Sequence, residues 1–162
     1  QTYRAEHLAL KRMMAVKLFA PPQAPSPDQA AALTTVDHSN VVHVYDFGTE
    51  KGVPYLAMEY VEGKPLSETG PLRPHQFLDL AEQAIEGLEA IHEAGLVHGD
   101  LKAANLLVTR EGEVKLANFG LAVEPREPKS DFDALAALLS AAAQGEVPGL
   151  AVLIRRLAPY WR

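Results

Sequence analysis

The stretch of sequence that decides the fold is residues 98–107, which read His98-Gly99-Asp100-Leu101-Lys102-Ala103-Ala104-Asn105-Leu106-Leu107. Upstream, the spacing of apolar residues predicts a long helix over residues 75–93, with Gly95 standing where a helix ends. Downstream, two short apolar runs predict a small hairpin over residues 106–116, followed by Asn118-Phe119-Gly120. The charged and amide side chains of this stretch therefore lie in a loop between a helix and a hairpin.

The loop and the tripeptide after the hairpin resemble the catalytic loop and the metal-binding motif of eukaryotic-type protein kinases, H-R-D-x-K-x-x-N and D-F-G. The aspartate of the loop lies five positions before its asparagine and eighteen before the asparagine of the tripeptide, as in that family. Three upstream segments add to the resemblance: residues 15–17 are similar to the V-A-I-K strand, 37–42 to the H-P-N-I-V segment, and 58–63 to the hinge. Together they resemble a bacterial-style serine/threonine protein kinase that is shortened and partly degenerate.

The order of elements, strands first and helices afterwards, predicts an α+β fold. The resemblance makes this prediction more specific and implies a protein-kinase-like fold with two lobes. We expect a small antiparallel sheet lobe over residues 1–61, a hinge or linker at 62–65 and a reduced helical lobe over 66–162. We expect the first lobe to lack the glycine-rich loop that the resemblance implies.

Apolar and β-branched runs predict the strands, and alanine-rich or amphipathic runs predict the helices. Asp28 is the expected cap of the first helix. Beside the elements above, we expect strands over residues 3–10, 13–19, 41–47 and 55–61, and helices over residues 28–36, 131–143 and 149–157.

The resemblance assigns chemistry to five polar residues. Lys17 would point its ammonium at the α- and β-phosphates of a nucleotide, and Asp100 would accept the substrate hydroxyl proton. Lys102 would steady the transferred phosphoryl group, while Asn105 and Asn118 occupy the metal-ligand positions. The alternative is a loop whose polar groups only satisfy buried backbone groups.

The resemblance also implies a slot for adenine. Ala15 and Leu107 would form its ceiling and floor. Met58, Glu59 and Val61 belong to the hinge, and the last two would offer it backbone groups. The implied cofactor is ATP with weakly bound Mg²⁺.

Several positions depart from an efficient kinase. Gln29 stands where a glutamate would pair with Lys17, and Asn118 stands where an aspartate would bind the metal, so two carboxylates are replaced by neutral amides. Only thirteen positions separate Asn118 from Asp131, which leaves no room for a typical activation segment. Gly99 replaces the arginine that would bind a phosphorylated activation loop.

Composition narrows the class of partner. The 162 residues carry a formal charge of −6, from 15 basic and 21 acidic residues, which argues against a general nucleic-acid surface. With no cysteine there are no disulfides or thiolate metal sites. No run of eighteen apolar residues indicates a membrane segment, and a cytoplasmic location is expected.

Three functions remain open at this stage. The chain could be a pseudokinase with weak ATP binding that acts through a protein partner, an active but reduced Ser/Thr or small-molecule phosphotransferase, or a structural domain of a larger assembly. A related choice concerns an apolar stripe on the helix at 131–143, which is either core or a docking face for a partner. The stripe consists of Phe132, Leu135, Leu138 and Leu139.

Overall fold

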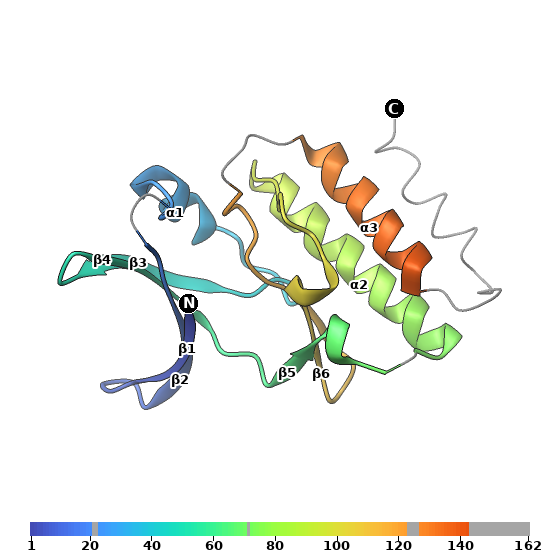
Figure 1. Ribbon diagram of the computed structural model, residues 1–162, viewed down its shortest axis with the longest axis horizontal. Coiled ribbons are helices and arrows are strands. Elements are labelled where there is room, and N and C mark those ends of the chain that lie inside the picture. The colour runs from blue at the N-terminus through green and yellow to red at the C-terminus, as the bar shows by residue number, and fades with distance from the viewer. Residues whose placement is uncertain (21–22, 71, 123–126, 143–162) are drawn as a thin grey trace.

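The structure of the chain is a computed structural model that describes residues 1–20, 23–70, 72–122 and 127–142. One lobe contains a four-stranded sheet and one short helix (Figure 1). The other lobe contains two long helices and a three-stranded sheet. The α+β, two-lobed kinase-like fold is thereby confirmed. Within the described ranges, no helix is both long and apolar enough to cross a membrane.

The first sheet is antiparallel, with the strand order β1-β2-β4-β3. Its pairing places Ala15 opposite Met58 and Lys17 opposite Leu56, so these side chains share one face. Two predicted strands are displaced in sequence: the third begins at residue 44 instead of 41, and the fourth ends at residue 59 instead of 61. The strands are β1 (Thr2–His7), β2 (Arg12–Leu18), β3 (Val44–Glu50) and β4 (Val53–Glu59).

Helix α1 (Pro27–Leu33) is shorter than predicted, and its cap differs from the predicted one. The Ser26 hydroxyl accepts from Gln29 N–H at 3.2 Å, and the Gln29 amide oxygen accepts from Ser26 N–H at 2.9 Å. This reciprocal capping box makes Ser26 the N-cap, with Asp28 inside the first turn. The prediction that Asp28 caps the helix is therefore wrong, because the hydroxyl of Ser26, one residue before Pro27, accepts from the backbone amide of Gln29.

The second sheet lies beside the long helices and has the order β5-β6-β7. Its first strand, β5 (Gly63–Pro65), falls in the segment predicted as a linker, and it pairs with β6 (Leu106–Thr109). Residues 63–65 form a strand in spite of their glycine and proline because they lie at the edge of the sheet, where a missing donor costs little. The hairpin of β6 and β7 (Val114–Leu116) agrees with the prediction.

The two long helices are α2 (Pro74–Glu93) and α3 (Pro128–Ala142). The apolar spacing that predicts α2 corresponds to a buried face, and Gly95 follows the helix at a φ of 75°. The residues of that face are Phe77, Ala81, Ala84, Ile85, Leu88 and Ile91. In α3, Phe132, Leu135 and Leu139 are at most 4% exposed and Leu138 is partly buried against the same core, so the apolar stripe is core. The docking-face alternative for this stripe is wrong. The helix predicted over residues 149–157 lies outside the described residues.

Residues 40–42 connect the two sheets. Val42 N–H donates to Leu116 O at 2.9 Å, and Leu116 N–H donates to Asn40 O at 2.8 Å. These bonds explain why the predicted strand at 41–47 starts late: its first residues are extended but pair with β7 of the second sheet. These bonds link the segment before β3 of the first sheet to β7 of the second.

Gly120 makes a close contact that a larger residue would disturb. Its φ is +65°, and a Cβ there would lie 2.6 Å from Leu33 Cδ2, whose side chain is 1% exposed. We expect Gly120→Ala to lower the free energy of unfolding by about 2–4 kcal/mol, from left-handed strain plus overpacking. Gly52→Ala is the matched control, because its φ is +79° and nothing lies within 4 Å of its Cβ position. Equal losses in urea denaturation would mean that the Leu33 contact does not matter.

Candidate nucleotide and catalytic site

The start of the loop at residues 98–107 is bound by Asp131, in the first turn of α3. Its carboxylate accepts from His98 N–H at 2.7 Å and from Gly99 N–H at 2.8 Å. The ring of His92, in the last turn of α2, lies 2.9 Å from the same carboxylate. Asp131 thus fixes the start of the loop against both long helices.

Asp131 is ionised in this position. Burial by itself would raise the pKa of its carboxyl, but the hydrogen bonds from His92, Gly99 and His98 together outweigh burial and hold the pKa below its usual range. The sequence patterns assigned no role to Asp131 or His92. The signal that could have found Asp131 is its place four residues before Leu135, on the apolar side of the helix, where an acid requires a buried partner.

Asp100 lies at the cleft with its side chain about half exposed, at 53%. Its Oδ2 accepts from Lys102 Nζ at 2.7 Å and from Asn105 Nδ2 at 3.1 Å. Burial alone would raise the pKa of Asp100, but the hydrogen bond and charge of Lys102 and the bond from Asn105 lower it overall. A carboxylate in this state can accept a proton from a bound hydroxyl.

The side-chain amide of Asn105 is buried, and it both donates and accepts hydrogen bonds. Its Nδ2 donates to the backbone oxygen of Asp100 at 2.7 Å, as well as to the Asp100 carboxylate. Its Oδ1 accepts from Asn118 Nδ2 at 2.9 Å. The oxygen that would bind a metal is therefore already engaged by a neighbouring amide.

Asn118 joins this group to the first sheet. It adopts a φ of +62°, which asparagine tolerates better than most residues, and its Oδ1 accepts from Lys17 Nζ at 2.8 Å. Lys17 and Asp100 are therefore joined by a continuous series of hydrogen bonds through Asn118 and Asn105. We call the five connected residues the polar chain: Lys17, Asn118, Asn105, Asp100 and Lys102.

Lys17 donates to Asn118, and not to Gln29, which stands at the position of the family's pairing glutamate. Among the described residues, the Gln29 side chain bonds only to the backbone of Ser26, because it completes the cap of α1. Burial lowers the pKa of Lys17 below its ordinary value of 10.5, with the charge of Asp100 opposing this shift. A half-buried ammonium bound to a neutral amide is well placed to receive an anion.

The polar chain does not fit a magnesium ion. Mg²⁺ prefers an octahedral set of oxygen ligands that includes carboxylates. Here the amide oxygens of Asn105 and Asn118 each accept a hydrogen bond, and Oδ2 of Asp100 accepts two. Within the described part of the chain, no three His, Asp or Glu residues are grouped as metal ligands.

The hinge residues are positioned by β4 and the segment after it. Met58 is 7% exposed, and the Glu59 carboxylate binds Lys115 Nζ at 2.9 Å, which joins the first sheet to β7. Glu59 N–H donates to His43 O, and the Val61 carbonyl accepts from Gly63 N–H. Among the described residues these two groups are thus engaged, which leaves Val61 N–H as a group that a ligand could use.

The adenine slot is the least defined part of the site. Ala15 and Leu107 are partly buried and pack against the common core. A groove of about 460 Å³ lies instead on the other face of the first sheet, and it contains none of the predicted site residues. Its lining includes Ala5, Met14, Val16, Tyr45 and Tyr55.

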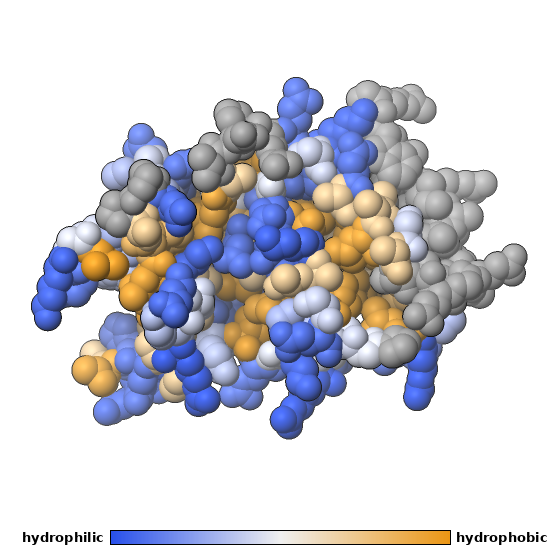
Figure 2. Space-filling view, viewed as in Figure 1, coloured by the Kyte–Doolittle hydropathy of each residue, from blue (hydrophilic) through white to orange (hydrophobic). Residues whose placement is uncertain are grey.

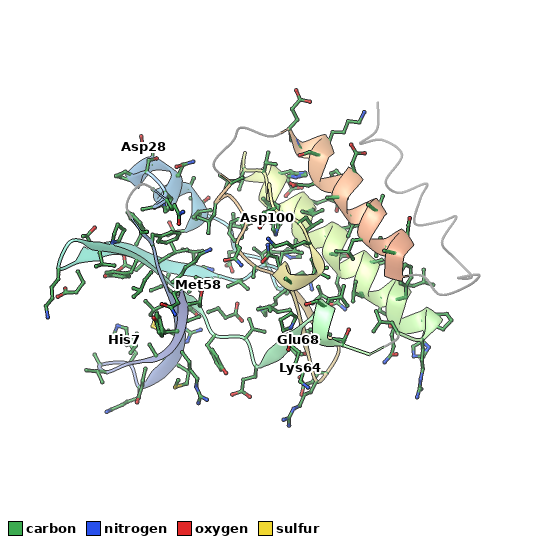
Figure 3. The ribbon with its side chains drawn as sticks, viewed as in Figure 1. His7, Asp28, Met58, Lys64, Glu68 and Asp100 are labelled. Carbon is green, nitrogen blue, oxygen red and sulfur yellow. The ribbon has the colours of Figure 1, made fainter. Side chains whose placement is uncertain are left out.

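The site has a polar centre within an apolar surround. Figure 3 places Asp100 on the helical side and Met58 on the sheet side of the region between the lobes. Figure 2 shows hydrophilic residues gathered at the middle of the same face, with apolar residues around them. This distribution suits a ligand that has an apolar ring and a charged tail.

The two lobes and the loop between them define a protein-kinase-like fold. The crystal structure of the Mycobacterium tuberculosis PknI kinase domain matches this fold with a TM-score of 0.74, covering 91% of this chain and 69% of that chain. The sequence identity is 23%, so this likeness concerns the fold.

The protein kinase domain family matches residues 1–139, and the chain belongs to that family. It is 34% identical to the serine/threonine-protein kinase PrkC of Bacillus subtilis over 131 residues, which are 74% of this chain and 20% of PrkC. It is 41% identical to PknL of Mycobacterium tuberculosis over 97 residues, covering 57% of this chain and 24% of PknL. The chain is thus a bacterial-style family member that spans about a fifth to a quarter of these relatives.

Proposed function

We propose that this chain is a pseudokinase module that binds ATP weakly and acts through a protein partner. The observation that carries the proposal is the amide of Asn118, which bonds to Lys17 and to Asn105 where the family has a metal-binding carboxylate. Protein kinases in general use ATP with Mg²⁺, and the ion stabilises much of the charge that develops on the transferred phosphoryl group. A site without an anionic metal ligand loses that stabilisation.

The chain between Asn118 and Asp131 supports the same proposal. These thirteen positions are too few for the segment on which a peptide substrate would lie. A module with a weakened metal site and no peptide platform is better suited to respond to a nucleotide than to phosphorylate proteins.

The partner would sense whether the cleft is occupied. Lys17 belongs to β2, and its contact with Asn118 is a direct side-chain link between the first sheet and the loop that follows β7. A phosphate that competes for Lys17 would change this link and shift the two lobes relative to each other. The proposal includes a cytoplasmic location, where ATP is supplied, and a role in signalling.

A reduced phosphotransferase is the second candidate. Asp100 and Lys102 keep the family residues, lie 2.7 Å apart and are each more than half exposed to the cleft, as a proton acceptor and a phosphate-binding cation require. Such an enzyme would work slowly and would depend on Asp100.

Transfer of the γ-phosphate from labelled ATP, to the chain itself and to a generic protein substrate, separates the two candidates. We expect no transfer by the wild type above the level of Asp100→Ala, together with a detectable thermal shift on adding ATP. Asp100→Ala should stay folded, because the side chain is half exposed and its bonds join polar groups at the cleft. Turnover that Asp100→Ala abolishes would favour the phosphotransferase and reject the pseudokinase.

A further inference from the structure

The polar chain carries an excess of positive charge. Lys17 and Lys102 are cations, Asp100 is an anion, and the two asparagines are neutral. Asp100 and Lys102 are also the charged groups that act on the pKa of Lys17. Of the neighbouring charged groups, the Glu59–Lys115 ion pair is internally balanced, and the buried Asp131 carboxylate is bound by the N–H groups of His98 and Gly99. The polar chain itself therefore presents a net positive charge to an anion without any added cation.

Among the described residues, the hydrogen bonds of the polar chain leave ammonium donors free and occupy the side-chain oxygens of the chain other than Oδ1 of Asp100. Each lysine ammonium has three donors, and in the structure Lys17 and Lys102 each direct one hydrogen bond to a neighbour in the chain. Both can therefore still donate to phosphate oxygens. The Oδ1 atoms of Asn105 and Asn118 already accept from Asn118 and Lys17, so a cation would have to displace a hydrogen bond at either one.

We infer that this cleft binds the polyphosphate of a nucleotide in its metal-free form, and that magnesium opposes binding. The inference rests on the proposed nucleotide binding and deepens it. Free ATP carries two more negative charges than its magnesium complex, so it is attracted more strongly to the two ammonium groups. The magnesium complex also brings a hydrated cation next to Lys17 and to amides that offer it no anionic ligand.

Calorimetric titration of the chain with ATP tests this inference, once with EDTA and once with excess magnesium. We expect the dissociation constant to be roughly tenfold higher with magnesium, which corresponds to about 1.4 kcal/mol. Lys17→Met should weaken binding in EDTA and remove most of the difference between the two conditions. Lys51→Met is the matched control, because Lys51 is an exposed lysine in the turn between β3 and β4 and lies outside the polar chain.

The outcomes separate the inference from the function beneath it. Binding that is equal or tighter with magnesium overturns the inference and leaves nucleotide binding intact. No binding in either condition, by protein that is folded by circular dichroism, overturns both. A loss that is the same for Lys17→Met and Lys51→Met would show that overall charge, and not the polar chain, attracts the nucleotide.

Discussion

Replacing Asp131 by alanine is expected to lower the free energy of unfolding by about 3–5 kcal/mol. The carboxylate is 2% exposed and accepts from His98 N–H and Gly99 N–H, so its removal leaves two buried donors without a partner. It also leaves the ring of His92 without its acceptor. This loss is a large part of the stability of a typical domain, and urea denaturation followed by circular dichroism measures it.

Asp133→Ala is the matched control for Asp131, since Asp133 is an exposed aspartate in the same helix. It should change stability by no more than about 0.5 kcal/mol. If both variants lost the same free energy, the loop would not depend on Asp131. If Asp131→Ala does not fold, Asp131→Asn keeps the shape and one acceptor, and it should show a smaller loss.

The pH dependence of stability provides a second measure of what the Asp131 carboxylate contributes. The pKa of Asp131 is lowered in the folded chain, so its stabilisation is complete above the unfolded value of about 3.9 and is lost as the pH falls through the folded pKa. Stability measured from neutral pH to about pH 3 should therefore fall more steeply for the wild type than for Asp131→Asn. Parallel curves would mean that another group causes the acid sensitivity.

Asn118→Asp is expected to reverse the effect of magnesium, so that ATP binds about tenfold more tightly with the ion than without it. The substitution supplies a charged oxygen ligand and removes the Nδ2 donor that occupies Asn105 Oδ1, so two ligand atoms become free. The new carboxylate also keeps an acceptor for Lys17, now as a charge-assisted pair. Titration with ATP, with and without magnesium, measures the change.

Asn118→Ala is the control for this variant, because it also releases Asn105 but adds no charge. It should leave ATP binding without a gain from magnesium. We expect Asn118→Asp to raise protein phosphorylation far less than affinity, since the thirteen positions before Asp131 do not build a peptide platform. Brisk phosphorylation of a generic protein by Asn118→Asp would refute the pseudokinase proposal.

Local patterns predicted much of the architecture. The helix at 75–93 and the hairpin at 106–116 agree with α2 and with β6 and β7, because a strong apolar period and a tight turn are encoded within each segment. Residues 41–43 and 63–65 were misplaced for the opposite reason. Which sheet an extended segment joins depends on the strand beside it, and that strand is distant in sequence.

The sequence by itself determined the kinase-like family, because the types and spacing of residues 98–107 and 118–120 are sufficient to identify it. Only the tertiary structure decided what those residues contact. Lys17 and Asn118 lie 101 positions apart and His98 and Asp131 lie 33 apart, and neither pair leaves a periodic signal. The Gln29 side chain accepts from the backbone of Ser26, a capping bond between neighbouring residues. The Lys17 ammonium donates to the side-chain amide of Asn118, which only folding brings close. The sequence shows that an asparagine stands at position 118 where the family has an aspartate. It does not show that this amide bonds to Lys17 and Asn105, because hydrogen bonds depend on where folding brings donors and acceptors together.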